Sequence, residues 1–211
     1  MTVSFRSFSE HLHSPHLPVK EIACKEWAVC IDALASGEQL ILVRKGGLLE
    51  ETREFRLEEQ SFYLYPTYEH QRADLVKPAW RDKVVAETAE GMEMPPREVT
   101  ITHLAHVVDD LTVKDDGEIL SRLDEFHILT PDYAEKRLQW QPNKPLHILI
   151  VRAYKLSEPC TVRVEDEYLG CKSWLFLQEP IENIDLTPVV PDVVFQAERE
   201  RILLAAGVNR H

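Results

Sequence analysis

Apolar positions in the first third of the chain follow two different periods. Residues 40–43 form a continuous apolar run, typical of a strand buried on both faces, and alternation around 55–57 and 62–64 predicts two more strands. Before them, a helical stripe predicts a helix that opens at Pro18 and ends at Gly37 as a left-handed cap. The members of this stripe, spaced i, i+3, i+4 and i+7, are Trp27, Cys30, Ile31 and Leu34.

Helices and strands continue to alternate in clusters along the rest of the chain. Thr67 is a good N-cap for a short helix over 68–77, and a second helix is expected over 79–90. Residues 91–96 form a short linker. The elements expected beyond it are a strand at 99–107, helical segments at 119–126 and 132–140, a strand at 146–156 with partners at 161–164 and 173–177, an extended connector at 180–191, and a helix at 194–206 closed by Gly207.

This order predicts an α+β fold, because strands come in groups and not singly between helices. We expect small mixed or antiparallel sheets, with a barrel-like arrangement as one alternative, flanked by short helices and a C-terminal helix. The domain organisation expected is a flexible arm (1–17), one α+β domain (18–180), and a connector with the terminal helix (181–211). Two packed subdomains, 18–90 and 98–180, are the alternative within the main domain.

Charge and composition narrow the function classes. The 211 residues carry 24 Lys and Arg against 36 Asp and Glu, a net charge of −12. Sequence-independent duplex binding is disfavoured, because it needs a dense basic surface that displaces counterions. No apolar run reaches the roughly 18 residues of a membrane-spanning helix, and the N-terminus lacks the apolar middle of a signal peptide. We therefore expect a cytoplasmic protein without membrane contact, whose four cysteines are thiols.

Motifs for metals and cofactors do not have the required spacing. The arm histidines (His11, His13 and His16) are interpreted as surface residues, and no CxxC pair is present. Residues 53–59 have one residue too many for the metal-binding helix of Nudix hydrolases. No Walker loop, GxGxxG or GxSxG occurs. We expect neither a metal nor a cofactor.

Two turns near the middle of the chain have residues suited to an anionic ligand. Arg44 and Lys45 end a buried strand, and Gly46 and Gly47 let backbone N–H groups approach a phosphate or carboxylate. The alternative is a tight turn with solvated cations. The second candidate is the expected helix start at Thr67, His70 and Gln71, where the positive helix end would favour a neutral imidazole, usable as a base or a hydrogen-bond donor. A capped helix with a packed histidine is its alternative.

A third candidate lies in the second half of the chain. Arg152 and Tyr154 share one face of the 146–156 strand, and an arginine inside so apolar a strand needs a partner. Trp174 follows a glycine turn nearby. Aromatic walls with one arginine could hold a base or another planar ligand. Ordinary core packing is the alternative for these aromatic residues.

The same motifs resemble a bacterial family called domain of unknown function 1802, which is common in cyanobacteria. The resemblance spans about 18–180 and leaves out the terminal helix at 193–207. Some members are joined to a restriction-endonuclease-like domain, which implies a role in nucleic-acid defence. The motifs that carry the resemblance are Lys25-Glu26-Trp27-Ala28, Leu42-Val43-Arg44-Lys45-Gly46-Gly47, Phe62-x-Leu64-x-Pro66-Thr67-x-x-His70-Gln71, Arg152-x-Tyr154 and Gly170-Cys171-x-Ser173-Trp174.

These observations favour a binding module for an anionic or nucleotide-like ligand. Its pocket would bring the Arg44 turn, the His70 segment and the Arg152 strand together, and a flipped base with its phosphates would fit without a globally basic surface. The first alternative is a phosphoesterase or nuclease-related enzyme with His70 as the base and Arg44, Lys45 and Arg152 as charge stabilisers. The second is a protein-interaction module, or self-association, through the C-terminal helix.

Overall fold

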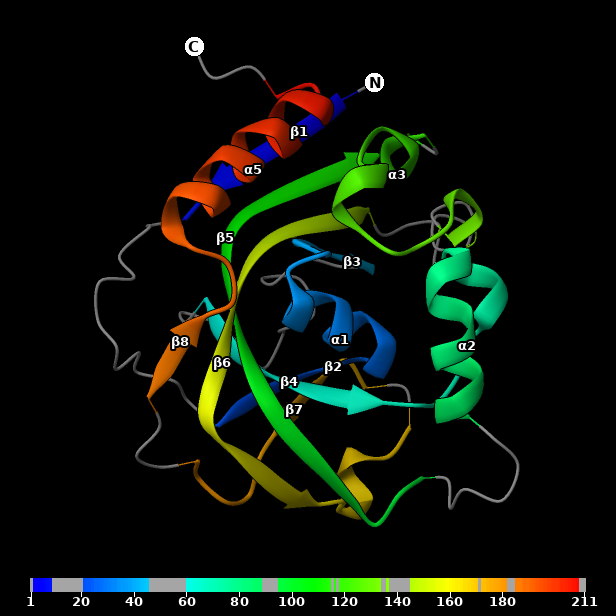
Figure 1. Ribbon diagram of the computed structural model, residues 1–211, viewed down its shortest axis with the longest axis vertical. Coiled ribbons are helices and arrows are strands. Elements are labelled where there is room, and N and C mark those ends of the chain that lie inside the picture. Colours follow the sequence, from blue (N-terminus) through cyan, green and yellow to red (C-terminus); the bar gives the residue numbers. More distant parts are fainter. Residues whose placement is uncertain are drawn as a thin grey trace.

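Eight strands form one mixed sheet in the part of the chain that the computed structural model describes, which is residues 2–8, 21–45, 60–88, 95–114, 116, 118–133, 136, 145–170, 172–181 and 185–208 (Figure 1). The strand order is β3-β6-β5-β4-β2-β7, with β1 paired to β5 and β8 paired to β6. The strands are β1 (Thr2–Ser7), β2 (Ile22–Trp27), β3 (Ile41–Lys45), β4 (Ser61–Thr67), β5 (Glu98–Lys114), β6 (Leu146–Arg163), β7 (Trp174–Phe176) and β8 (Leu186–Pro188).

The two longest strands, β5 and β6, form an antiparallel pair around which the sheet curves (Figure 1). Their register shifts twice, between Ile101 and His103 and between Val107 and Asp109 on β5. Bulges of this kind bend a strand and increase its twist. Among the described residues β3 and β7 are the two ends of the sheet and no ladder joins them. The sheet is therefore strongly curved without closing into a barrel.

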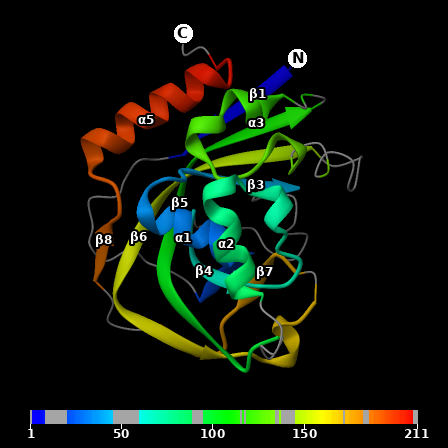
Figure 2. The ribbon, with the colours of Figure 1, turned by 45° about the vertical axis from the view of Figure 1, so that its right-hand side comes forward.

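The helices fill and cover this curved sheet. In the described part they include α1 (Ala28–Ser36), α2 (Pro78–Glu87), α3 (Ile119–Arg122) and α5 (Asp192–Ala205), with 3-10 turns η1 (Ala73–Leu75), η2 (Asp124–Phe126) and η3 (Asp166–Tyr168). Residues 131–133 are also helical, within the expected helix at 132–140, most of which lies outside the described part. Helix α1 is buried nearly all round, because Val29 and Cys30 pack into one apolar cluster and Ile31 and Leu34 into another. Figures 1 and 2 show α5 beside β1 at one end of β5.

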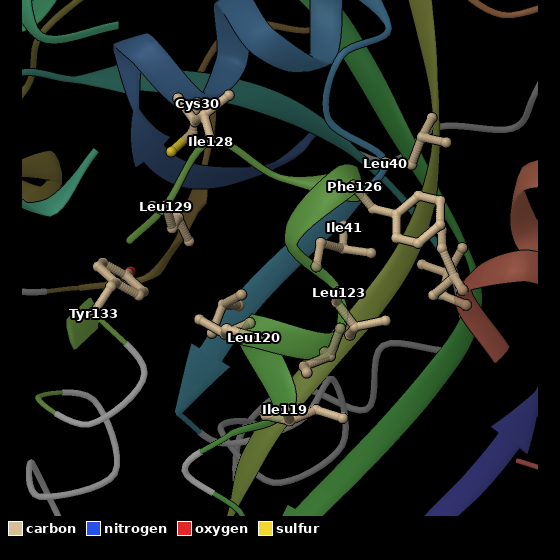
Figure 3. Close-up of a cluster of buried hydrophobic side chains, with 14 of the residues drawn as sticks. Cys30, Leu40, Ile41, Ile119, Leu120, Leu123, Phe126, Ile128, Leu129 and Tyr133 are labelled. Carbon is tan, nitrogen blue, oxygen red and sulfur yellow. The ribbon is translucent and has the colours of Figure 1, made fainter. Parts of the chain in front are cut away.

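The largest apolar cluster joins β3, α1 and the α3–η2 segment. Figure 3 shows Cys30 of α1, Ile41 of β3, and Leu120, Leu123 and Phe126 of the α3–η2 segment within it. Its members come from both sides of the predicted linker, so strands and helices from 18–90 and from 98–180 share a core. The predicted domain boundaries themselves stay a prediction. None of the described helices combines the length and the apolar character that crossing a bilayer requires.

The α+β class, the mixed sheet and the C-terminal helix are confirmed, while several local expectations are wrong. Residues 22–27 are strand β2, not helix, because this mostly buried segment pairs with both β4 and β7, and the helix begins only at Ala28. Short buried runs do not distinguish strand from helix by period alone. Gly37 does end α1, in the left-handed region with a φ of 78°.

Other differences concern strand pairing and the N-terminal arm. Residues 161–163, expected as a separate partner strand, are the last residues of β6 itself. Strand β7, expected to pair with the 146–156 strand, pairs with β2 instead. Within the extended connector, β8 adds to β6. Residues 2–7, expected in a flexible arm, form β1 on β5, and residues 9–17 with the arm histidines lie outside the described part. The expected strand at 55–57 also lies outside it.

Candidate ligand-binding pocket

An ion pair joins β3 to β2, although β6, β5 and β4 lie between them in the sheet. Arg44 on β3 donates from Nη1 to Oε2 of Glu26 and to the backbone oxygen of Lys25, each at 3.2 Å. The sheet curvature makes this contact possible, because it turns the end of β3 toward the end of β2. Arg44 and Glu26 therefore bridge the side of the sheet that no ladder closes.

A cavity of about 570 Å³ opens beside this ion pair. Its walls come from the ends of β2, β3 and β4, from the segment that follows β4, and from the turn before β7. Tyr133 and Lys136 complete it. The described side chains that line it include Lys25, Glu26, Trp27, Val43, Arg44, Lys45, Thr67, Glu69, His70, Arg72, Leu75, Tyr133, Lys136 and Lys172.

The cavity has an apolar floor and a charged rim. Trp27, Val43, Leu75 and Tyr133 are buried, and the rings of Trp27 and Tyr133 meet edge to face with centroids 5.5 Å apart. Arg72 and other charged lining residues lie at the exposed edge. Aromatic edges and faces at the floor suit a planar apolar group, whereas the rim suits an anion.

Positive charge predominates in the lining. Among the described residues, six Lys or Arg side chains and His70 line the cavity, against two carboxylates, Glu26 and Glu69. This local balance is opposite in sign to the net charge of the whole chain, −12. Burial lowers the pKa of Lys45, the innermost lysine of the group. A cavity lined mainly by one sign of charge concentrates ligands of the other sign.

Neighbouring groups hold several of these cations in place. Lys25 donates from Nζ to the backbone oxygen of Gly170, and Lys172 donates to that of Glu167, both at 3.1 Å. At the rim, Arg72 and Lys136 share the carboxylate of Asp74. The hydrogen bond from Arg72 lowers the pKa of the Asp74 carboxyl. The rim is thus an organised group of charges and not a set of separate side chains.

His70 lines the cavity, but not at the start of a helix as the sequence predicted. Residues 69–70 form a turn, η1 begins only at Ala73, and the next helix is α2. The Glu69 N–H donates to Oγ1 of Thr67 at 3.3 Å, so Thr67 stabilises a turn and caps no helix. The argument from the helix dipole therefore does not apply to His70. Its φ of 62° lies in the left-handed region, where strained residues often belong to functional sites.

Gln71 is used inside the fold and does not line the cavity. Its Oε1 accepts the backbone N–H of Val29 in the first turn of α1, at 3.1 Å, and its Nε2 donates to Glu87 of α2 at 3.1 Å. Burial raises the pKa of the Glu87 carboxyl, and the Gln71 hydrogen bond partly offsets this effect. Gln71 thus ties the His70 segment to α1 and α2, and so fixes that wall of the cavity.

The Arg152 strand does not contribute to this cavity. Arg152 forms an ion pair with Asp192 at the start of α5, and its guanidinium lies over the rings of Tyr154 and Phe195, at 5.3 and 5.6 Å from their centroids. Tyr154 belongs to an apolar cluster, where burial raises its pKa to about 12. The predicted meeting of Arg152 and Tyr154 with the other candidate residues is therefore wrong in its geometry.

The structure thus brings Arg44, Lys45, Thr67 and His70 to one cavity. Trp174 lies behind its wall, with the Arg44 guanidinium 5.6 Å from its ring centroid and Phe62 packed edge-on at 4.9 Å. Gly46 and Gly47 lie outside the described residues.

Several lining residues were missed from the sequence. Lys25, Glu26 and Trp27 belong to one of the motifs that carry the family resemblance, and this motif could have identified them. They were not assigned to the site because a helix, and not strand β2, was expected there. Tyr133, Lys136 and Lys172 had no comparable signal, because only tertiary folding brings them to the cavity.

The comparison with family models identifies the chain's family. The model described as "Domain of unknown function (DUF1802)" matches residues 23–201, and the chain therefore belongs to this family. The match extends into α5, which the sequence resemblance had left out. No curated protein matches the chain.

Among solved structures, a crystal structure of ASCH from Zymomonas mobilis is similar at 11% identity and a TM-score of 0.42, covering 75% of this chain and 87% of that one. Two mutant forms of the same protein give 10% and 12% identity and TM-scores of 0.41 and 0.42. Their alignments cover 75% and 76% of this chain and 88% and 92% of theirs.

Proposed function

We propose that the protein is a binding module for an anionic, nucleotide-like ligand, held in the cavity between β2, β3 and the His70 segment. The single observation that supports this most is the lining itself, which is rich in Lys and Arg within a strongly acidic chain. A cavity that reverses the charge of the whole chain has the charge pattern of an anion site.

The size and floor of the cavity support a ligand with a planar group. Small-molecule sites typically enclose roughly 300–1,000 Å³ and combine apolar walls with a few oriented polar groups, and about 570 Å³ with an aromatic floor fits that description. A nucleotide unit would place its base toward Trp27 and Tyr133 and its phosphate toward the cations. A base taken out of a nucleic-acid strand would be accommodated in the same way.

The alternative of phosphoester cleavage has less support. His70 lines the cavity together with Arg44 and Lys45, but the helix start that would keep its imidazole neutral is absent from the described structure. Arg152, the third charge stabiliser of that hypothesis, is paired with α5. Binding without turnover is therefore the function that the geometry favours.

Partner binding through the C-terminal helix is also less favoured. Of the large apolar side chains exposed on α5, Val193 and Val194 lie in its first turn and Leu204 in its last, with none between them, so they do not form a continuous stripe. Single exposed apolar residues are ordinary on soluble surfaces. A role accessory to nucleic-acid defence, which the family resemblance implies, stays a prediction.

Calorimetric titration with adenosine 5′-monophosphate tests the proposal. We expect saturable binding that weakens as salt rises, at least tenfold weaker binding in Arg44→Ala, and unchanged binding in Arg152→Ala. Arg152 is a matched control because it is also a buried, ion-paired arginine next to aromatic rings, but lies outside the cavity lining. Equal affinity in all three proteins, or no binding in any, would contradict the proposed function.

A further inference from the structure

Within the cationic cavity, one carboxylate occupies the position that a ligand anion would seek. Glu26 accepts the Trp27 N–H through Oε1 at 2.8 Å and the Arg44 guanidinium through Oε2 at 3.2 Å. Its side chain is 10% exposed and lines the cavity. Because the Trp27 bond fixes one oxygen at the junction of β2 and α1, the other is directed at Arg44 by the backbone.

We propose that Glu26 is a built-in competitor of the ligand: its carboxylate holds Arg44 when no ligand is bound, and the ligand's phosphate takes its place. This inference rests on the proposed function and names the residue that sets the affinity of the site. The ligand it implies carries a phosphate, whose oxygens match a guanidinium at least as well as a carboxylate does.

Arg44 has other contacts that keep it in place after the exchange. Its Nη1 also bonds to the backbone oxygen of Lys25 at 3.2 Å, and its guanidinium lies 5.6 Å from the centroid of Trp174. Neither contact uses the Glu26 carboxylate. The arginine therefore stays in the cavity wall, oriented toward an incoming anion, when Glu26 releases it.

The energetic consequence is a penalty on every anion that binds. The ligand must replace an existing charge-assisted bond and must also approach a negative charge in a partly desolvated site, where Coulomb interactions are stronger than in water. Removing that charge should strengthen the binding of anions and leave neutral ligands unaffected. Moving the carboxylate away from Arg44 should also strengthen the binding of anions, but to a smaller extent, without removing any charge.

Glu69 provides a matched control in the same cavity. It is the second carboxylate among the described lining residues, and its described hydrogen bond is the one its backbone N–H donates to Thr67. Glu69→Gln therefore removes the same amount of charge as Glu26→Gln but leaves the Arg44 ion pair intact. In Glu26→Gln an amide oxygen can still accept the Trp27 or Arg44 hydrogen bond, so we expect this variant to fold.

The experiment compares four proteins by calorimetry, with adenosine 5′-monophosphate and neutral adenosine as probes. We expect Glu26→Gln to bind the nucleotide at least tenfold more tightly than wild type, Glu69→Gln less than threefold more tightly, and neither variant to change adenosine binding. Glu26→Asp keeps the charge but has a shorter reach, so tighter binding in this variant cannot come from charge removal. It also serves as the second test if Glu26→Gln fails to fold.

The outcomes separate this inference from the proposed function. Wild-type binding that depends on Arg44, with Glu26→Gln and Glu26→Asp unchanged, would overturn the competitor role and leave the proposed function in place. Equal tightening in Glu26→Gln and Glu69→Gln, with Glu26→Asp unchanged, would reduce the effect to general charge and overturn it as well. No nucleotide binding in any of the four proteins would overturn both.

Discussion

Arg44 and Arg199 are both buried arginines that join elements which no backbone ladder connects, yet their surroundings differ. Arg199 of α5 gives Nε and Nη2 to the two oxygens of Asp109 on β5, at 2.5 and 2.8 Å, and Nη2 also reaches Oγ of Ser7 on β1. Its side chain is 1% exposed and that of Asp109 is 0% exposed. Arg44 donates from Nη1 to Oε2 of Glu26, and both side chains line the cavity.

The difference shows how to distinguish a structural ion pair from a binding one. In the Arg199 pair both carboxylate oxygens and two guanidinium nitrogens are bonded in a closed, dry geometry, so a ligand could neither reach nor improve it. The Arg44 pair instead lines a cavity that a ligand can enter. Burial alone therefore does not separate the two pairs; the adjoining cavity does.

The largest expected effect is on stability, at Arg199. Arg199→Met leaves the Asp109 carboxylate buried without its partner, which typically costs about 3–5 kcal/mol. Urea denaturation followed by circular dichroism should show this loss, while nucleotide binding by the folded fraction stays at the wild-type level. The double variant Arg199→Met with Asp109→Leu should recover much of the stability, because it removes both charges. A loss below about 1 kcal/mol in the single variant would contradict a structural role.

The core cluster near α5 should also make folding sensitive to acid, through His127. Burial lowers the pKa of this histidine, whose Nε2 bonds to the Leu120 oxygen while Nδ1 accepts the Leu129 N–H. A proton on Nδ1 would break the second bond. Because the folded state binds that proton less readily than the unfolded state, its stability is fully present above a pH of about 6.5 and is lost as pH falls through the range below it.

The measurement is the free energy of unfolding between pH 7.5 and pH 5. One such group contributes a slope of at most about 1.4 kcal/mol per pH unit. His127→Gln, whose amide can both donate and accept a hydrogen bond, should flatten the slope. A slope identical to that of wild type would assign the acid sensitivity to other groups, such as His103, whose pKa burial also lowers.

At Arg44 the expected effects on stability and on binding are reversed relative to Arg199. Arg44→Ala removes hydrogen bonds at a cavity surface where water can reach Glu26, so we expect a stability loss of about 1–2 kcal/mol together with at least tenfold weaker nucleotide binding. Denaturation and calorimetry on the same preparation give both quantities. A stability loss as large as that of Arg199→Met, with binding retained, would reverse the assignment of the two arginines.

The smallest effect is expected at Arg201, two residues beyond Arg199 on the same helix. Its guanidinium pairs with Glu125 and Glu198 on the surface. Exposed pairs of this kind contribute little, because water screens them and the long side chains lose freedom. Arg201→Ala should leave the thermal unfolding midpoint and nucleotide binding at wild-type values. A clear drop in the midpoint would show that charge on α5 matters more than burial.

The sequence alone predicted those parts of the fold that depend on local pattern. The C-terminal helix, the left-handed glycine at Gly37 and a buried strand at 40–43, observed as β3 (Ile41–Lys45), all follow from spacing and from the residue types at the ends of elements. The β2 segment could not be assigned in this way, because its apolar residues are buried by β4 and β7, which lie far away in the chain.

The same limit explains what was predicted of the site. Arg44 and Lys45 were found because two cations directly followed a predicted buried strand, and His70 because it followed another strand. In the structure the two cations are the last residues of β3 and not part of a turn. Arg152 was also a candidate from the sequence, but it pairs with Asp192 of α5, forty residues further along the chain. A local sequence pattern cannot predict that pairing. Glu26 was missed because its partner, Arg44, is also distant in the chain. The two side chains meet across the open side of a sheet whose curvature depends on bulges in β5.

The bond from Arg199 to Ser7 makes the two extremities of the polypeptide depend on each other. Strand β1 and helix α5 are attached to β5 at the same aspartate, so deleting residues 2–8 would remove a hydrogen-bond acceptor from the helix anchor as well as an edge strand. Variants that lack residues 2–8 should therefore hold α5 less firmly against the sheet. Protease cleavage within 192–205 should then be faster in these variants than in the wild type.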